Sequence, residues 1–271
     1  MNGASREALA AARERLDALT DSTSVDAAQL ADELAAVTAL LDREAGLRRV
    51  LTDPAQPAEA KAELVQRLLG AQVSGSTADL VSGMARARWS QPRDLVDALE
   101  ELADIADLTA AEKTGTLDEV EDELFRFGRI VSSSTDLRAA LTDRAAGTAA
   151  KTELLHRLLG GRAKPVTERL VTRLVTVPRG RSLEAGLESL SKLAAERRDR
   201  MVAVVTSAVP LSDPQKQRLG AALAKLYGRR MHLNLDVDPD VIGGIRVQVG
   251  DEVINGSLAD RLDDAARRMA S

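Results

Sequence analysis

Residues 47–70 have the sequence LRRVLTDPAQPAEAKAELVQRLLG, and a closely similar stretch, LRAALTDRAAGTAAKTELLHRLLG, occupies residues 137–160. The two stretches align without a gap at an offset of 90, and 14 of their 24 positions are identical. Shared helical composition would give scattered leucine matches, but it would not place LTD, KxEL and RLLG in one ungapped register. The chain therefore contains a duplicated unit of about 90 residues. That period is too long for the common solenoid repeats and predicts duplication of a whole domain.

The correspondence continues on both sides of these stretches. The further matches are Asp32–Leu34 with Asp122–Leu124, Leu80–Val81 with Leu170–Val171 and, after a slip of two residues, Arg93–Leu102 with Arg181–Leu190. The last pair shares the pattern RxLxxxLExL. Two copies thus account for most of the chain before residue 200.

Within each copy the hydrophobic pattern is helical, and Gly and Pro mark the turns between helices. The LTD motif ends one helix and opens a turn, and Pro57 suits the first turn of the next helix, where its missing N–H costs nothing. An apolar stripe at i, i+4 spacing follows, and Gly70 and Gly160 are predicted to be left-handed C-cap residues. Each copy is predicted to be a compact antiparallel helical bundle, over residues 1–108 and 109–200.

The sequence changes character after Arg200. Met201–Ala208, MVAVVTSA, is short and β-branched, as strands are. The helix predicted over 211–227 opens with a capping box formed by Ser212 and Gln215. In the next strand, alternation places Met231, Leu233, Leu235 and Val237 on one face.

A hairpin is predicted to follow this strand. Residues 245–249 alternate, Gly250–Asp251 suits a two-residue type II′ turn, and Val253–Ile254 returns. A last helix opens at Ser257. The predicted fold class is therefore mainly α, with two tandem helical bundles followed by a small α/β domain of order βαββα over residues 201–271.

Composition excludes several classes of protein. The net charge of −5 gives no basic surface of the kind that phosphate binding needs, so no nucleic-acid partner is expected. The chain has no cysteine, which excludes disulfides and thiolate chemistry. No stretch approaches the roughly 20 apolar residues that cross a bilayer, so membrane contact is expected only through partners.

No motif predicts a catalytic, cofactor-binding or metal-binding residue. Gly243–Gly244 lacks the Lys-Ser/Thr of a P-loop, so a backbone role at a strand start is expected. The two histidines are His156, a polar surface position on a helix, and His232, on the polar face of a strand. Without cysteine they do not suggest a His/Cys zinc site.

Three aspartates near a turn alternate in the manner of cation ligands. They are Asp236, Asp238 and Asp240. They lack the Gly and Glu of an EF-hand loop and are interpreted as solvated turn residues. We therefore expect no enzyme activity, no cofactor and no metal.

Residues 238–262, DPDVIGGIRVQVGDEVINGSLADRL, resemble the signature of the ATP synthase delta subunit family, to which the mitochondrial oligomycin-sensitivity-conferring protein belongs. The matching positions are Asp238, Pro239, Ile242, Gly243, Gly244, Val247, Gly250, Asp251, Ile254, Ser257, Arg261 and Leu262. Asn255 departs from the pattern, because the family usually has Asp there. The resemblance extends upstream, so that residues from about 110 to 271 resemble an ordinary delta subunit. The first copy is extra, as in the long form associated with actinobacteria.

The resemblance implies a non-catalytic connector in the peripheral stalk, part of the stator that supports proton-driven ATP synthesis. In the family, the helical domain binds the N-terminal helix of an alpha subunit, and the C-terminal domain binds the b subunits. It also implies a peripheral location at the cytoplasmic face of the cell membrane, reached through the complex. Which helical copy binds the alpha subunit stays open.

Helix density also suggests an alternative, an all-α RNA-binding module of the transcription-antitermination type. RNA binding favours basic patches and stacking rings. This chain is acidic and has only four aromatic residues, Trp89, Phe125, Phe127 and Tyr227.

Overall fold

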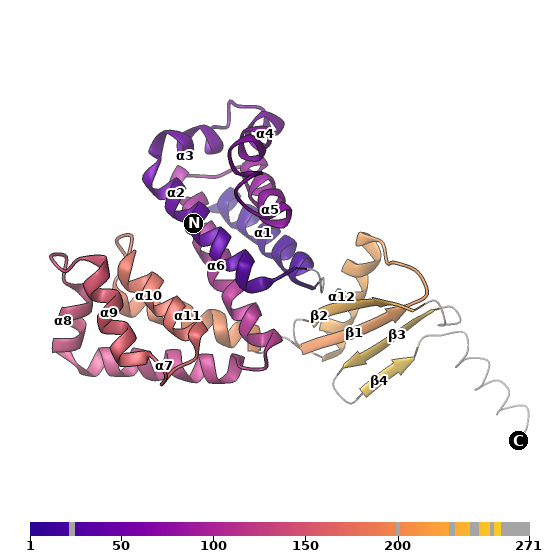
Figure 1. Cartoon of the computed structure of the whole chain (residues 1–271). Coiled ribbons are helices and arrows are strands. Elements are labelled where there is room, and N and C mark those ends of the chain that lie inside the picture. The colour runs from indigo at the N-terminus through magenta and orange to yellow at the C-terminus, as the bar shows by residue number, and fades with distance from the viewer. Residues whose placement is uncertain (22–24, 199–200, 228–230, 239–243, 250–251, 256–271) are drawn as a thin grey trace, which may run out of the picture. The chain divides into compact units, whose positions relative to one another are not determined.

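The structure is a computed structural model of the whole chain, and it describes residues 1–21, 25–198, 201–227, 231–238, 244–249 and 252–255. The chain forms two compact units, residues 1–195 and residues 196–271 (Figure 1). The first unit is helical and the second contains a sheet, which confirms the predicted fold class.

The first unit is built from two similar sets of helices. Copy one has α1 (Gly3–Asp21), α2 (Ala27–Arg43), α3 (Ala45–Thr52), α4 (Ala58–Leu69), α5 (Gly75–Arg86) and α6 (Pro92–Lys113). Copy two has α7 (Leu117–Ser133), α8 (Thr135–Thr142), α9 (Thr148–Leu159), α10 (Pro165–Thr176) and α11 (Leu183–Arg198). The helices α7 to α10 begin and end 90 positions after α2 to α5, which confirms the duplication at the level of single helices.

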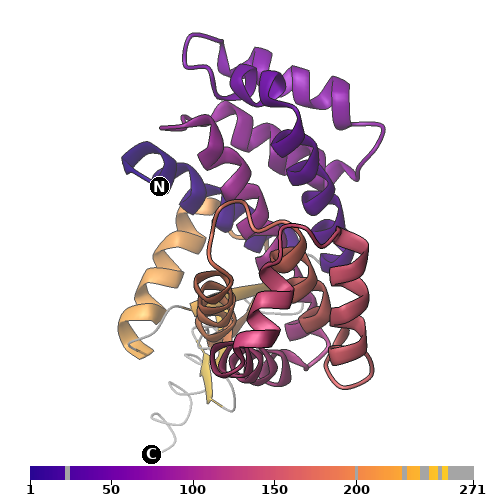
Figure 2. The same ribbon diagram turned by 90° about the vertical axis from the view of Figure 1, so that its left-hand side faces the viewer.

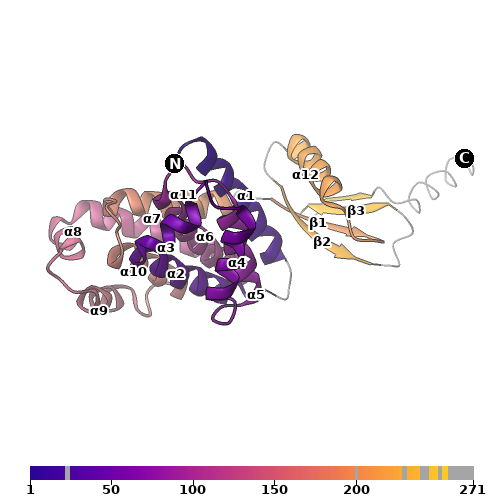
Figure 3. The same cartoon turned by 90° about the horizontal axis from the view of Figure 1, so that it is seen from above.

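One helix serves both copies. The offset of 90 places α1 on residues 93–111, which lie inside α6. The residues of α6 up to Ala106 belong to the core of copy one, and Leu108 and Ala111 belong to the core of copy two. The helix packs against α1, α2 and α3 of copy one and against α7 and α10 of copy two. Figures 2 and 3 show the helical unit from two further directions. The boundary expected between residues 108 and 109 falls inside this unbroken helix.

The LTD motif forms the same turn in both copies. The hydroxyl of Thr52 donates to the carbonyl of Arg48 at 2.9 Å, and that of Thr142 donates to Arg138 at 2.8 Å. The aspartate that follows accepts from the backbone N–H two residues later, at 2.9 Å in copy one and 2.8 Å in copy two. The motif thus ends a helix by local hydrogen bonds, as predicted.

The two glycines that follow the next helix are not left-handed, so their predicted role is wrong. Gly70 has φ −58° and ψ −22°, and Gly160 has φ −56° and ψ 122°. Both backbone N–H groups still bond to the carbonyl four residues earlier, and a Cβ at either glycine would lie 2.5 Å from that oxygen. Close approach to the helix end, rather than left-handed geometry, therefore requires glycine here. At this helix end of copy two, the left-handed residue is the next one, Gly161, at φ +69°.

The second unit is a four-stranded sheet with one described helix. Its elements are β1 (Met201–Ser207), α12 (Asp213–Tyr227), β2 (Met231–Val237), β3 (Ile245–Val249) and β4 (Glu252–Asn255). The strand order is β2-β1-β3-β4, with β1 and β2 parallel and the other pairs antiparallel. The returning arm of the hairpin forms a strand of its own, which the formula βαββα did not count. The helix predicted from Ser257 and the turn at Gly250–Asp251 lie outside the described residues.

Alternation in the strands builds the core of this unit. Ala203, Val205, Val247 and Val249 are buried against Leu223 of α12. One half of the predicted capping box forms, because Gln215 Oε1 accepts from the backbone N–H of Ser212 at 2.8 Å. The hydroxyl of Ser212 donates to the same oxygen at 2.8 Å, and the backbone N–H of Gln215 bonds to the Ser212 carbonyl instead of to that hydroxyl. Val237, predicted on the inner face, is 46% exposed at the end of β2.

Candidate interaction surfaces

In each copy a glutamate ties one helix to the N-terminus of another. The carboxylate of Glu33 in α2 accepts from the N–H and hydroxyl of Ser74, at 3.0 and 2.7 Å, and from the hydroxyl of Thr77 at 2.5 Å. Burial raises the pKa of Glu33, but hydrogen bonds from Ser74, Thr77 and Gln29 outweigh burial and hold that pKa below its usual value. The N–H groups at a helix N-terminus have no partner within the helix and favour a negative charge, so the carboxylate fixes where α5 begins.

Copy two repeats the backbone and threonine bonds of this arrangement, with Lys164 in the place of Ser74. Glu123 Oε2 accepts from the N–H of Lys164 at 2.9 Å and from the hydroxyl of Thr167 at 2.5 Å. Sequence comparison matched Asp32–Leu34 with Asp122–Leu124 but did not show what the glutamate in each segment binds. The aligned threonines 44 residues further on were the available signal.

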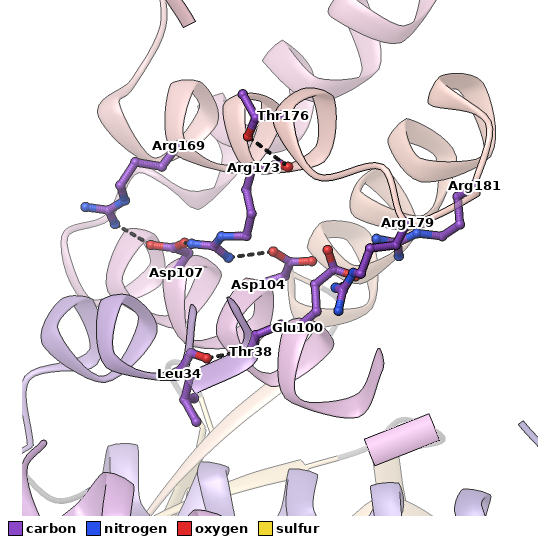
Figure 4. A network of polar contacts seen from close by, with 10 residues as sticks. All are labelled: Leu34, Thr38, Glu100, Asp104, Asp107, Arg169, Arg173, Thr176, Arg179 and Arg181. Carbon is purple, nitrogen blue, oxygen red and sulfur yellow. Dashed lines mark hydrogen bonds and ion pairs between the residues drawn. The ribbon is translucent and has the colours of Figure 1, made fainter. Parts of the chain in front are cut away.

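An ionic cluster joins the two copies along α6 (Figure 4). Arg173 of α10 bridges two acids of α6, with Nη1 2.7 Å from Asp104 Oδ1 and Nη2 2.7 Å from Asp107 Oδ2. Arg169 also pairs with Asp107, and one turn earlier on α6 Glu100 pairs with two arginines from the α10–α11 connection.

Those two arginines are Arg179 and Arg181, and the backbone at Arg179 has an unusual conformation. Arg179 has φ +45°, a left-handed conformation that residues other than glycine seldom adopt. Its Nη1 also donates to the backbone carbonyl of Val96 at 3.4 Å. The loop of copy two is thus held against α6 by an ion pair and a backbone hydrogen bond.

Burial and charge act in opposite directions on the acids of this cluster. Burial raises the pKa of Asp104 to about 7, against the lowering effect of Arg173 and with further raising by Glu100 and Asp107. Burial also raises the pKa of Asp97, although Arg179, Arg93 and Arg181 lower it. Such buried pairs fix a packing geometry more than they add stability, because desolvation offsets most of the attraction.

Among the described residues of copy one, the two arginines of α10 have no equivalent. The positions of α5 that align with Arg169 and Arg173 are Asp79 and Gly83, and the arginine that α5 does carry, Arg86, pairs with Glu59 of α4. Sequence analysis missed the cluster because it used the identities between the copies. The places where aligned positions change charge were the signal that would have found it.

Grooves open on the described part of the helical unit, including the following three. One lies between α7 and α11, has a volume of about 790 Å³ and is lined by residues that include Phe125, Ile130 and Leu187. A second, of about 540 Å³, lies in copy one beside Trp89 and Pro54. A third, of about 470 Å³, lies in copy two around the α8 and α10–α11 segments. Grooves between helices are where a partner helix binds.

The histidines, glycines and aspartates that the sequence analysis considered as possible ligands do not form a common site among the described residues. His156 is exposed and its Nδ1 lies 2.8 Å from Glu168 Oε1; the hydrogen bond to Glu168 raises its pKa. Gly244 has φ +90°, which fits the backbone role expected of this pair, and Asp236 is exposed. Gly243 and Asp240 lie outside the described residues, as does the side chain of His232.

Across the part of the chain that the structure describes, no three His, Cys, Asp or Glu side chains gather as metal ligands would. Over the same residues, no helix combines the length and apolar character needed to span a membrane.

Comparison with known proteins gives consistent matches over the whole chain. The sequence model of the family "ATP synthase delta (OSCP) subunit" matches twice, over residues 17–109 and 105–269. ATP synthase subunit delta of Streptomyces coelicolor is 82% identical over 271 residues, covering 100% of this chain and 99% of that protein. ATP synthase subunit delta of Thermobifida fusca is 48% identical over 270 residues, covering 100% of both.

Among solved structures, a chain of the cryo-EM structure of the Toxoplasma gondii mitochondrial ATP synthase hexamer is 21% identical. That match covers 62% of this chain and 97% of that one with a TM-score of 0.28, too low to support an argument. The double family match agrees with the duplication, and none of these matches supports the RNA-binding alternative. The family is a non-catalytic structural component of its complex. The chain belongs to the ATP synthase delta (OSCP) subunit family.

Proposed function

We propose that this chain is the stator connector of a proton-translocating ATP synthase. In this proposal the helical unit binds the N-terminal helix of an alpha subunit, and the second unit binds the b subunits of the peripheral stalk. The observation that carries the proposal is the division of a delta-family chain into two compact units with separate cores. A unit with its own core can fold alone, so each unit can present an attachment surface of its own.

The mechanical task is to resist torque while the rotor turns, and it needs no chemistry. A partner helix that lies in a groove buries apolar area over several turns. Several such attachments in series raise the overall affinity, because release of one leaves the others to hold the partner nearby. The ionic cluster along α6 supports the role, since directional ion pairs keep the two helical copies from sliding.

The chain is proposed to lie at the cytoplasmic face of the cell membrane, peripheral, and to reach the membrane only through the complex. No nucleic acid, cofactor or metal enters the proposal. Which helical copy binds the alpha subunit is left to experiment.

Pull-down with separately purified alpha and b subunits tests the proposal. The full chain is expected to retain both, and to show no ATP hydrolysis above a blank. Failure to bind either subunit, or ATP turnover by the isolated chain, would refute it. Binding of only one subunit would refute the bridging part of it.

A further inference from the structure

The last helix of each copy presents an equivalent stripe of residues. Aligning Arg93–Leu102 with Arg181–Leu190 pairs α6 with α11. The stripe on α6 is Val96, Leu99, Glu100 and Ala103, and the stripe on α11 is Glu184, Leu187, Glu188 and Ser191. The duplication therefore allows one stripe to be compared with the other.

On α6 the stripe is covered. Val96 and Leu99 are fully buried and Glu100 is only 3% exposed. Copy two supplies part of the cover, because Arg179 and Arg181 both pair with Glu100 and Arg179 donates to the carbonyl of Val96. A loop segment that carries two arginines thus meets the acid of this stripe.

On α11 the equivalent stripe is one wall of the groove of about 790 Å³ between α7 and α11. Leu187 forms its floor, since it is only 2% exposed. Glu188, the counterpart of the buried Glu100, is exposed and has no partner among the described residues, whereas Glu184 pairs with Arg138 at 3.3 Å.

The opposite wall of the groove is unusually apolar for a surface. Phe125 of α7 is 57% exposed and Ile130 is 53% exposed, whereas Trp89 and Phe127 are buried. The positions of copy one that align with Phe125 and Ile130 are Ala35 and Leu40, and both pack against the core there. Exposed aromatic and aliphatic side chains gathered in one groove are typical of a protein–protein interface.

We propose that the α7–α11 groove binds an amphipathic helix of a partner subunit, with its apolar stripe against Phe125 and Leu187 and a lysine or arginine opposite Glu188. The groove lies between two helices, which suits a third helix. The basic residue is inferred from charge complementarity, because the equivalent acid of α6 takes two arginines. On the α7 rim, Arg129 is exposed and favours an acidic residue on the other flank of the bound helix. The inference rests on the proposed connector function and adds a surface to it.

Two groove variants of the full chain test the proposal, Phe125→Ser and Glu188→Arg. The control for Glu188→Arg is the same change at an exposed glutamate of α4, Glu63→Arg, and the control for Phe125→Ser is the loss of another exposed apolar side chain, Leu68→Ser in α4. Binding is measured to the synthase assembled without this subunit, with the melting temperature of each variant recorded. Each groove variant is expected to weaken binding at least about tenfold, and each control by less than about twofold.

Groove variants that melt like the unsubstituted chain and bind as tightly would overturn the inference and leave the connector function intact. An unsubstituted chain that does not bind the assembly would refute both. If a groove variant has a lower melting temperature than the unsubstituted chain, a second experiment tests the inference. It places a photo-crosslinking amino acid at position 125 of the chain in the assembled synthase. A crosslink to a helical partner segment with lysine or arginine on one flank supports the inference. A crosslink to residues 196–271 of this chain, to a segment without basic residues, or to nothing overturns it.

Discussion

Two threonine hydroxyls, one in each copy, are fully buried against a carboxylate from another helix. Hydrogen bonds to a charged acceptor contribute about 1.5–3 kcal/mol to stability. Loss of the donor also leaves a partly buried carboxylate oxygen without a hydrogen-bond partner. Thr77→Val keeps the shape and removes the hydroxyl. We expect it to lower the free energy of unfolding by about 1.5–3 kcal/mol in urea titration.

The matched control for this change is Thr109→Val in α6. Thr109 is also buried, but its hydroxyl donates only to the carbonyl of Ile105 in its own helix, at 2.8 Å. That substitution is expected to cost about 1 kcal/mol or less. Equal losses for the two variants would show that the glutamate contact adds nothing beyond burial.

Asp104 makes the helical unit sensitive to pH. Its pKa is about 7 in the folded chain against an ordinary 3.8, because burial disfavours the charged form. Between these values the folded state binds more protons than the unfolded state, so stability falls as pH rises from about 4 to about 7. Asp104→Asn removes this dependence. We expect its free energy of unfolding to fall less between pH 5 and pH 8, by on the order of 1–3 kcal/mol.

The exposed Asp32 gives a control for the pH series. Asp32→Asn should reproduce the pH profile of the unsubstituted chain, because both retain Asp104. His156, whose pKa is also raised, loses its contribution as pH rises and does so equally in all three proteins. Parallel profiles for Asp104→Asn and the unsubstituted chain would contradict the assignment to Asp104.

At the scale of single elements, α6 contributes to both cores of the first unit and is expected to couple their unfolding. Leu108 of this helix is fully buried in the core of copy two, while Trp89, the only tryptophan, is buried in the core of copy one. Leu108→Ala is expected to cost about 2–5 kcal/mol. Since the helix runs unbroken through both cores, the transition followed by Trp89 fluorescence should shift to lower temperature.

Val205→Ala provides the comparison for the α6 experiment, because Val205 is buried in the core of the second unit. It should leave the Trp89 transition where it is. If Leu108→Ala does not change the midpoint temperature of the Trp89 fluorescence transition, the two copies unfold independently in spite of the shared helix.

The elements that sequence could predict are those with local causes. The LTD turn and the capping box at Ser212 depend on hydrogen bonds within a few residues, and the strands depend on alternation. Local patterns could not predict that α6 contributes to both cores, because this depends on helices of both copies that pack against it. The ionic cluster likewise joins residues 62 to 81 positions apart, such as Asp107 with Arg169 and Glu100 with Arg181.

At the scale of the whole molecule, the two units have separate cores and should be separable. A fragment of residues 1–195 contains both helical cores and the ionic cluster along α6. It is therefore expected to retain the helical circular dichroism of the first unit and a Trp89 transition within a few degrees of the full chain. If the second unit is the attachment to the b subunits, this fragment should lose b binding and keep alpha binding. Pull-down against each subunit, with the full chain as control, measures both. A fragment that is folded and still binds the b subunits would show that the stalk attaches to the helical unit, whereas a fragment that unfolds would show that the two units depend on each other.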